Sequence, residues 1–232
     1  MEPGAAAAAA TFEERYGWKV AVSFPDEERA MSSVGFADMS HIWKMEIQGD
    51  VAAITGRNLE LGTATRSDGA WWCPYSPTRA VVLCRSCDTV AIRDRLTASA
   101  ADANGLGSLI DITSAQGAMT VLGPLAREVF ARFTAIDLRP RITPVHAFRP
   151  GSVARTGGAI LCEAPDRYLM LFGAALGQYV WTVVDDAARH LGGGPIGTDA
   201  LPPLDALPAS DGAGPTAATS AGDAPSPEAP DA

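Results

Sequence analysis

Residues 108–133 read SLIDITSAQGAMTVLGPLAREVFARF, and this stretch decides the fold. A short apolar run ends at Asp111, and a second β-prone run over residues 117–122 is closed by Gly123-Pro124. Apolar side chains then recur at helical spacing from Leu125 to Phe133, and the preceding proline suits the fixed φ of a first helical turn. The pattern predicts a strand, a turn, a second strand and then a helix.

The same order of features occurs twice in the chain. Residues 38–52 repeat the pattern of residues 111–126. A tighter match aligns residues 76–84 (SPTRAVVLC) with residues 164–172 (APDRYLMLF), and each is followed by a helical pattern. Repeated units of this size indicate an internal duplication. Chance similarity between short apolar runs is the alternative.

The repeat predicts an α+β fold in which one domain is built from two related β/α halves. The halves are expected at about residues 34–100 and 107–191, within a single domain over residues 12–200. A chain of 232 residues is long enough to bury a sizeable core in such a domain.

The two ends of the chain differ from its centre in composition. Residues 1–11 contain six consecutive alanines, which predict a loose, disordered tip. Residues 201–232 are rich in Pro, Ala, Ser, Gly and Asp, which predict a disordered acidic tail.

The distribution of charge argues against a nucleic-acid partner. The net charge is −9, but no Lys or Arg follows Arg189, so the acidic tail carries most of that charge and the rest of the chain is almost neutral. Binding a phosphate backbone needs a basic patch, and the sequence has none. No apolar run reaches the length that spans a bilayer, and no secretory signal opens the chain, so no membrane partner is expected.

Four cysteines are too few for a disulfide scaffold in a chain of this length. Cys84 and Cys87 form a lone CxxC between a predicted strand and a predicted helix, which is compatible with a redox or metal site. Zinc would need a second pair or nearby histidines, and the three histidines are scattered. The sequence therefore favours structural cysteines, no metal site and a reducing cytoplasm.

Two stretches are candidate contact surfaces. Residues 71–75 (WWCPY) are the most aromatic run, and they suit either core packing or the wall of a ligand or partner surface. Adjacent residues on a strand face opposite sides, so one tryptophan could be exposed. Residues 137–150 form a proline-rich connecting loop with Arg139, Arg141 and Arg149, which either are solvated or meet an acidic partner.

No catalytic constellation is evident in the sequence. His41 follows Asp38 and Ser40 closely, but a triad requires convergence in space rather than adjacency in sequence. Asp185 and Asp186 are neighbours on a predicted helix, where they point about 100° apart. We therefore predict no catalytic residue.

Several motifs carry a family resemblance over about residues 34–200. Residues 34–52, VGFADMSHIWKMEIQGDVA, are similar to the opening signature of the folate-binding domain of aminomethyltransferases, the T-protein of glycine cleavage. Residues 111–196 resemble more closely the γ subunit of heterotetrameric sarcosine oxidase, a smaller relative of that domain. The features that carry this second resemblance are Asp111-Ile112-Thr113, LGPLAR at 122–127, IDLRP at 136–140, PGSVART at 150–156, and YVW at 179–181 ahead of DDA at 185–187.

The sequence departs from the aminomethyltransferase pattern at three places. Those enzymes carry an acidic residue after the glycine turn of the middle hairpin, whereas residues 68–75 (DGAWWCPY) have no carboxylate after the turn. Their Arg-Thr-Gly segment continues into an acid-rich loop, but here residues 155–158 (RTGG) run into an apolar strand. Their C-terminal barrel also has no counterpart in this sequence.

The resemblance implies a non-catalytic γ subunit of a sarcosine oxidase-like complex. Such complexes demethylate sarcosine oxidatively with FAD, FMN, NAD and tetrahydrofolate, and this chain would pack against larger flavin- and folate-binding subunits. Trp71, Trp72, Tyr75, Arg139 and Arg141 are then the candidate partner contacts. A stand-alone folate-binding protein is the alternative, with Arg155 holding a carboxylate in a folate-like pocket, and a redox protein acting through the CxxC is a third class.

Overall fold

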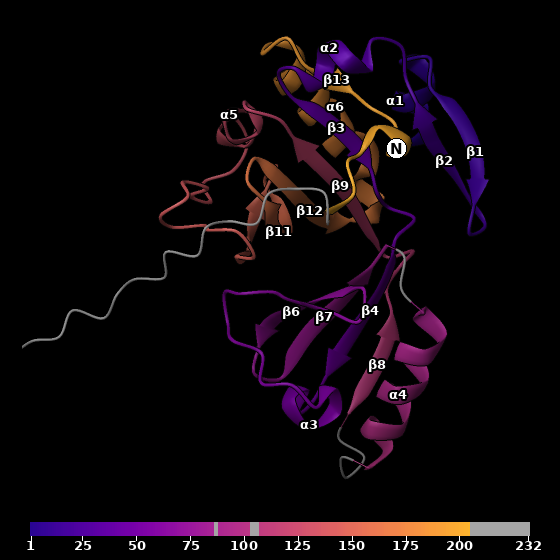
Figure 1. Ribbon diagram of the computed structural model, residues 1–232, viewed down its shortest axis with the longest axis vertical. Coiled ribbons are helices and arrows are strands. Elements are labelled where there is room, and N and C mark those ends of the chain that lie inside the picture. The colour runs from indigo at the N-terminus through magenta and orange to yellow at the C-terminus, as the bar shows by residue number, and fades with distance from the viewer. Residues whose placement is uncertain (86–87, 103–106, 205–232) are drawn as a thin grey trace, which may run out of the picture.

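The computed structural model describes residues 1–85, 88–102 and 107–204. Their sheets and helices form four stacked layers (Figure 1). Helices cover the outer face of an upper sheet, the inner face of that sheet packs on a lower sheet, and helices α3 and α4 cover the far side of the lower sheet. Within the described residues, every strand pair is antiparallel except β13 with β3. The fold therefore mixes helices with antiparallel sheets, as the sequence predicted in outline.

The elements have the following bounds. Helices are α1 (Glu2–Ala7), α2 (Glu27–Met31), α3 (Val51–Thr55), α4 (Thr89–Asp102), α5 (Ala126–Ala131) and α6 (Gly177–Arg189), with 3-10 turns η1 (Ala174–Leu176) and η2 (Thr198–Ala200). Strands are β1 (Thr11–Arg15), β2 (Trp18–Ser23), β3 (Gly35–Asp38), β4 (Trp43–Gln48), β5 (Thr65–Ser67), β6 (Ala70–Ser76), β7 (Arg79–Cys84), β8 (Ser108–Asp111), β9 (Gln116–Leu122), β10 (Phe148–Val153), β11 (Thr156–Ala164), β12 (Arg167–Gly173) and β13 (Gly194–Pro195).

Equivalent strands follow one another in the same order in the two large sheets. The lower sheet runs β5-β6-β7-β4-β8, and the upper sheet runs β10-β11-β12-β9-β3 with β13 added at its edge. Each position in one sheet therefore has a counterpart in the other. The two stretches that matched in sequence, residues 76–84 and 164–172, contain the corresponding strands β7 and β12.

Alternation along the strands divides the apolar side chains among three cores. On β7, Ala80 and Val82 face α3 and α4, whereas Val81 and Leu83 face the upper sheet. Both faces of both sheets are thus covered. This is why the central strands read as almost continuous apolar runs.

The strands that precede β4 and β9 are exchanged between the sheets. Strand β3 pairs with β9 in the upper sheet while the chain continues into β4 below, and β8 pairs with β4 in the lower sheet while the chain continues into β9 above. At one crossing the Ser40 amide donates to Asp38 (2.9 Å), and at the other the Thr113 amide donates to Asp111 (2.9 Å). The two crossings therefore contain the same kind of turn.

A hydroxyl at each crossing links it to the neighbouring strand. Ser40 Oγ accepts the Ala118 amide of β9 (3.2 Å), and Thr113 Oγ1 accepts the Lys44 amide of β4 (3.0 Å). The Lys44 side chain is fully buried beside them, and its Nζ donates to the carbonyl oxygens of Ser40 (2.8 Å) and Ile42 (2.9 Å). Burial lowers the pKa of Lys44 to about 8 despite attraction from Asp38 and Asp111.

Some local predictions are confirmed. Residues 66–69 (RSDG) have the composition of a hairpin turn, and they form a two-residue loop between β5 and β6 with positive φ at Asp68 (55°) and Gly69 (73°). Asp50 follows Gly49 at the end of a predicted strand, where an N-cap is expected, and its side chain caps α3 by accepting the Ala53 amide at 3.0 Å.

The N-terminal tip is not loose. Residues 2–7 form α1, Ala5 is 2% exposed, and α1 packs on α6. A Cβ at Gly4 would lie 2.3 Å from the Trp181 ring, so the small residues allow close approach to α6. Composition alone missed this contact because the partner surface lies about 180 residues away in the chain.

The apolar pattern of residues 152–161 predicts one β segment, whereas the structure has a hairpin there. Strand β10 ends at Val153, and Ala154 and Arg155 form a two-residue turn with positive φ (48° and 61°) before β11. Residues 205–232, predicted to be a disordered tail, lie outside the described residues. No helix of the described chain is long and apolar enough to cross a membrane.

The crossing at Thr113 supplies a stability test. Thr113→Val removes the acceptor for the Lys44 amide, so the free energy of unfolding should fall by about 1–3 kcal/mol in urea titrations. The control is Thr97→Val on the exposed face of α4, which should change it by less than about 0.5 kcal/mol. Equal effects of the two changes would contradict the role of the crossing.

Candidate functional site

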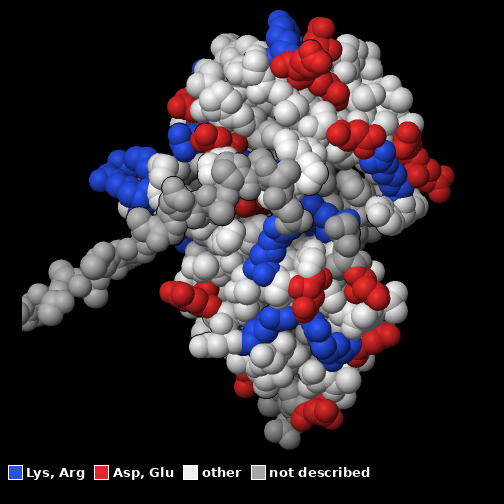
Figure 2. Space-filling model, in the orientation of Figure 1, with Lys and Arg blue, Asp and Glu red and all other residues white. Residues whose placement is uncertain are grey.

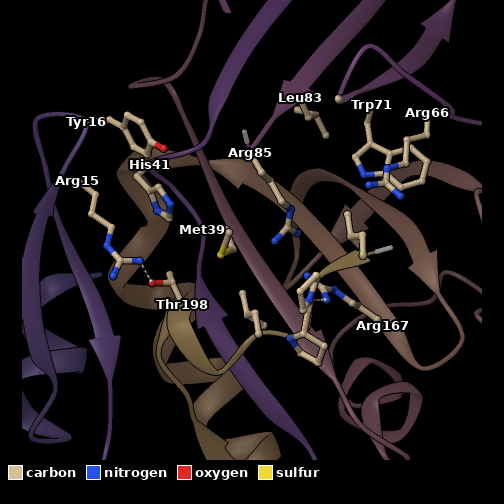
Figure 3. Close-up of a pocket in the computed structure, with 15 residues that line it drawn as sticks. Arg15, Tyr16, Met39, His41, Arg66, Trp71, Leu83, Arg85, Arg167 and Thr198 are labelled. Carbon is tan, nitrogen blue, oxygen red and sulfur yellow. Dashed lines mark hydrogen bonds between the residues drawn. The ribbon is translucent and has the colours of Figure 1, made fainter. Parts of the chain in front are cut away.

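A cavity of about 330 Å³ lies at one end of the space between the two sheets (Figure 3). Four arginines line it, and none of the described lining residues is Asp or Glu: Arg15, Arg66, Arg85 and Arg167. Figure 2 shows Lys and Arg side chains gathered across the middle of this face, between the upper and lower sheets. The cavity wall is therefore basic although the chain as a whole is acidic.

The arginines come from both sheets because the alternation of each strand directs them inward. Arg85 follows β7 with the same parity as Val81 and Leu83, and Arg167 begins β12 with the same parity as Leu169 and Leu171. Charged side chains at these positions replace the apolar ones that fill the rest of the inter-sheet core. The end of the core is consequently hollow and polar.

A buried carboxylate holds two of these arginines. Glu163 on β11 has a side chain with 0% exposure. Its two oxygens each accept Arg85 Nη2 at 2.8 Å, and one of them accepts Arg167 Nε at 3.2 Å. Arg85 Nη2 also donates to Thr120 Oγ1 at 3.0 Å. Two guanidinium groups thus share one buried carboxylate.

The positive charge of this cluster lowers the pKa of its basic neighbours. Burial lowers the pKa of Arg167, and repulsion from Arg85 and Arg66 adds to that effect while Glu163 opposes it. Burial also lowers the pKa of His41 to about 4, and Lys44, Arg85 and Arg15 lower it further. His41 is therefore a neutral imidazole near pH 7.

Two donors beside the cavity have no hydrogen-bond partner. Trp71 is 3% exposed, and its Nε1 is buried and unpaired. Arg85 Nε is also buried and has no hydrogen-bond partner. The Arg66 guanidinium lies 5.8 Å from the Trp71 ring, and the His146 ring meets that ring edge-on at 5.1 Å.

The outer wall is made by the first hairpin and the C-terminal segment. Arg15 donates to Asp199 (2.5 and 2.9 Å) and to Glu13 (2.9 Å), so its charge is compensated. Residues 198–204 cross the opening, where Arg167 Nη1 donates to the Pro202 carbonyl at 2.5 Å. Tyr16, which is 81% exposed, lines this cavity and a second one of about 510 Å³ that also contacts His41 and Arg85.

The described residues contain no catalytic triad around His41. Asp38 and Ser40 belong to the crossing between β3 and β4, where their polar atoms contact each other and Ala118. The two acids of α6 are engaged elsewhere: Asp185 pairs with Arg189 (2.8 Å), and Asp186 lies 3.6 Å from His190. The basic wall is suited to holding an anion rather than to transferring a proton.

Two of the cysteines are buried thiols, and no metal cluster occurs among the described residues. Cys73 and Cys162 are free and buried, and burial raises the pKa of Cys73 well above its usual value and that of Cys162 to about 12. Cys84 ends β7, but Cys87 lies outside the described residues. Within the described ranges, no group of three or more His, Cys, Asp or Glu side chains could hold a metal ion.

The aromatic run is core rather than surface. Trp71 faces the inter-sheet core and Trp72, with 0% exposure, faces the core under α3 and α4, so the predicted opposite orientations are confirmed. Of the two alternatives for this run, core packing holds for both tryptophans, because both faces of the lower sheet are covered. Tyr75 is half-buried, with its ring edge-on to Phe148 at 5.1 Å.

The arginines named from the sequence lie apart from the cavity. Arg139 and Arg141 are exposed in the loop between α5 and β10, where Arg139 pairs with Asp137 (2.9 Å). Arg155 is exposed at the turn between β10 and β11. Glu163 lies eight residues further along the chain, roughly 25 Å at the rise of an extended strand, so Arg155 does not belong to the cavity.

Sequence reasoning missed the residues that make the cavity, above all Arg66, Arg85, Glu163 and Arg167. One signal was available. Glu163 and Arg167 flank the Ala-Pro-Asp turn between two continuous apolar strands, and charged residues at inward positions of buried strands are unusual.

No protein-family model matches the sequence, and no curated protein matches it. Solved structures share its fold. The heterotetrameric sarcosine oxidase from Corynebacterium sp. U-96, in complex with pyrrole 2-carboxylate, contains a chain that is 16% identical with a TM-score of 0.62, over 71% of this chain and 88% of that one. The glycine cleavage system aminomethyltransferase T from Bartonella henselae is 15% identical with a TM-score of 0.67, over 84% of this chain and 58% of that one.

The low pKa of His41 predicts a pH dependence of stability. In the unfolded chain a histidine titrates near pH 6.5, so between about pH 6.5 and 4 the unfolded state binds the additional proton. The free energy of unfolding should therefore fall as the pH falls through this window. The contribution of His41 is full above pH 6.5 and decreases by roughly 2–3 kcal/mol by pH 4.5.

Urea titrations of the wild type and of His41→Asn at pH 7 and pH 4.5 check this. The wild type should lose roughly 2–3 kcal/mol more than the variant between the two pH values. The carboxylates titrate in both proteins and cancel in the comparison. Equal losses would mean that the imidazole is already protonated, or freely solvated, in the folded state.

Proposed function

We propose that this chain is an accessory, non-catalytic subunit of the γ type in a heterotetrameric sarcosine oxidase-like complex. The observation that carries the proposal is the extent of the fold match. This chain accounts for 88% of a chain from a sarcosine oxidase but for only 58% of an aminomethyltransferase. A fold shared at this identity does not fix function, so the role in a complex is an inference from size and architecture.

In this proposal the chemistry belongs to the partner subunits. The complex would demethylate sarcosine oxidatively in the cytoplasm, with FAD, FMN and NAD in larger subunits and tetrahydrofolate as acceptor of the one-carbon unit. This chain would then contribute surface and stability to the assembly.

The loop between α5 and β10 is the proposed partner contact. It presents Arg139 and Arg141 together with Ile142, an exposed aliphatic residue (45%). Arginines beside an exposed apolar group are the composition that protein interfaces favour. Tyr75 is the remaining aromatic candidate, whereas the burial of Trp71 and Trp72 removes the reason for assigning them to a partner.

We also propose that the two sheets arose by internal duplication. The matching strand orders, the two equivalent Asp-containing turns at the crossings and the sequence match between residues 76–84 and 164–172 support this. In such an origin, exchange of β3 and β8 between the halves would tie two copies into one domain.

The subunit proposal is tested by gentle purification of a tagged copy from its native host. We expect two or three larger chains to co-purify, together with visible flavin absorbance. A colourless single chain would contradict the proposal.

Charge reversal tests the contact loop. The double variant Arg139→Glu, Arg141→Glu should lower recovery of the partner chains by roughly tenfold. The reason is that an acidic partner surface, which attracts the two arginines, would repel two glutamates. The matched control reverses two exposed arginines outside that loop, Arg29→Glu and Arg93→Glu, and should recover the partners normally. Equal recovery from both variants would remove the loop from the interface.

A stand-alone folate-binding protein is the second candidate. The cavity of about 330 Å³ between the sheets and the neighbouring cavity of about 510 Å³ favour it, because they could hold part of such a ligand. Calorimetric titration of the isolated chain with tetrahydrofolate separates the two functions. Heat that saturates with ligand, from a chain without partners, would favour this candidate over the subunit.

A further inference from the structure

We infer that the 330 Å³ cavity between the sheets is a binding site for a small oxyanion, a phosphate or carboxylate group held by Arg66, Arg85 and Arg167. The inference goes beyond the proposed subunit role and does not depend on it. It rests on the charge of the wall, on unpaired donors beside it and on the rigidity of the groups that form it.

The wall of the cavity carries an excess of positive charge. Arg85 and Arg167 share a single carboxylate, Glu163, so this buried cluster keeps one positive charge that no protein group in it compensates. Arg66 also lines the cavity, but it is exposed and has contacts of its own, so it is not counted in this charge. Uncompensated charge away from water is costly, and an anion in the cavity offsets that cost.

Two hydrogen-bond donors beside the cavity are available to a ligand. Arg85 Nε and Trp71 Nε1 are both buried, and both lack an acceptor. An unpaired buried donor is unfavourable. A ligand oxygen that accepts a hydrogen bond from either group therefore gains more binding free energy than it would from a donor that water already satisfies. Both residues line the cavity, and Arg85 lies at its centre in Figure 3.

Two guanidinium groups of the wall are preorganised. Glu163 and Thr120 fix the Arg85 guanidinium from the upper sheet, and the Pro202 carbonyl and Glu163 fix that of Arg167. Planar guanidinium groups held in this way match the oxygens of phosphate and carboxylate groups. Little side-chain freedom is left to lose on binding, which favours affinity.

The neighbouring groups agree with an anion and disfavour a cation. His41 stays neutral near pH 7, since burial and the adjacent positive charges of Lys44, Arg85 and Arg15 lower its pKa to about 4. Glu13 and Asp199, next to the lining residue Arg15, are occupied by hydrogen bonds with it. An incoming anion therefore meets no uncompensated carboxylate in the described wall.

Thermal unfolding of the full chain with inorganic phosphate tests the site. At constant ionic strength maintained with chloride, the midpoint should rise with the logarithm of the phosphate concentration above Kd, by about 5–10 °C at a hundredfold excess over Kd. Malonate serves as the carboxylate arm. A rise with phosphate alone assigns a phosphate-bearing ligand, and a rise with malonate alone assigns a carboxylate; no rise beyond the chloride control with either would overturn the inference.

Variants localise the binding. Arg66→Gln should weaken the more strongly bound anion by about 10–100-fold, the usual effect of losing one charged hydrogen-bond partner. Trp71→Phe keeps an aromatic side chain, although a smaller one, and removes the Nε1 donor, so it should weaken binding by several-fold while the chain remains folded. Arg93→Gln, which removes an exposed arginine of α4, is the matched control and should leave affinity unchanged.

An equal loss of affinity in Arg66→Gln and Arg93→Gln would mean that the anion responds only to overall charge, and the site would be rejected. Unchanged affinity in both Arg66→Gln and Trp71→Phe would also reject it. These readouts use the isolated chain, so they stand whether or not partner subunits co-purify with it.

Discussion

The reciprocal crossing of the chain between two sheets is the constraint on which the rest of the structure depends. Strand β3 serves the upper sheet and its continuation β4 serves the lower one, while β8 and β9 do the reverse. Ser40 and Thr113 tie each crossing to the next strand through backbone amides. Because each sheet contains a strand from the other half of the chain, neither sheet is complete without the other.

The crossing also explains where polar groups are buried. Two sheets packed face to face exclude water from their shared side, so every charge there needs a partner. Lys44 donates to carbonyl oxygens of the crossing itself, whereas Arg85 and Arg167 pair with Glu163. The second arrangement leaves positive charge in excess, and the cavity lies where that excess is.

The ends of the chain complete the upper part of the structure. Helix α1 packs on α6, and residues 198–204 run over the opening of the cavity, where Arg167 binds the Pro202 carbonyl. A supporting subunit and an anion-binding cavity are compatible roles, since the proposed contact loop and the cavity use different arginines. The fold places the first set on an exposed loop and the second between the sheets.

The sequence by itself determined the local elements: the strand–turn–strand–helix order of residues 108–133, the hairpin turn at Asp68-Gly69, and the cap at Asp50 all follow from short-range sterics and hydrogen bonding. It also placed Trp71 and Trp72 on opposite faces. Only the tertiary structure decided that both faces are covered and that α1 is packed. It alone brought Arg85, Glu163 and Arg167 together, because the pairing of distant strands depends on packing between sheets, which local patterns do not record.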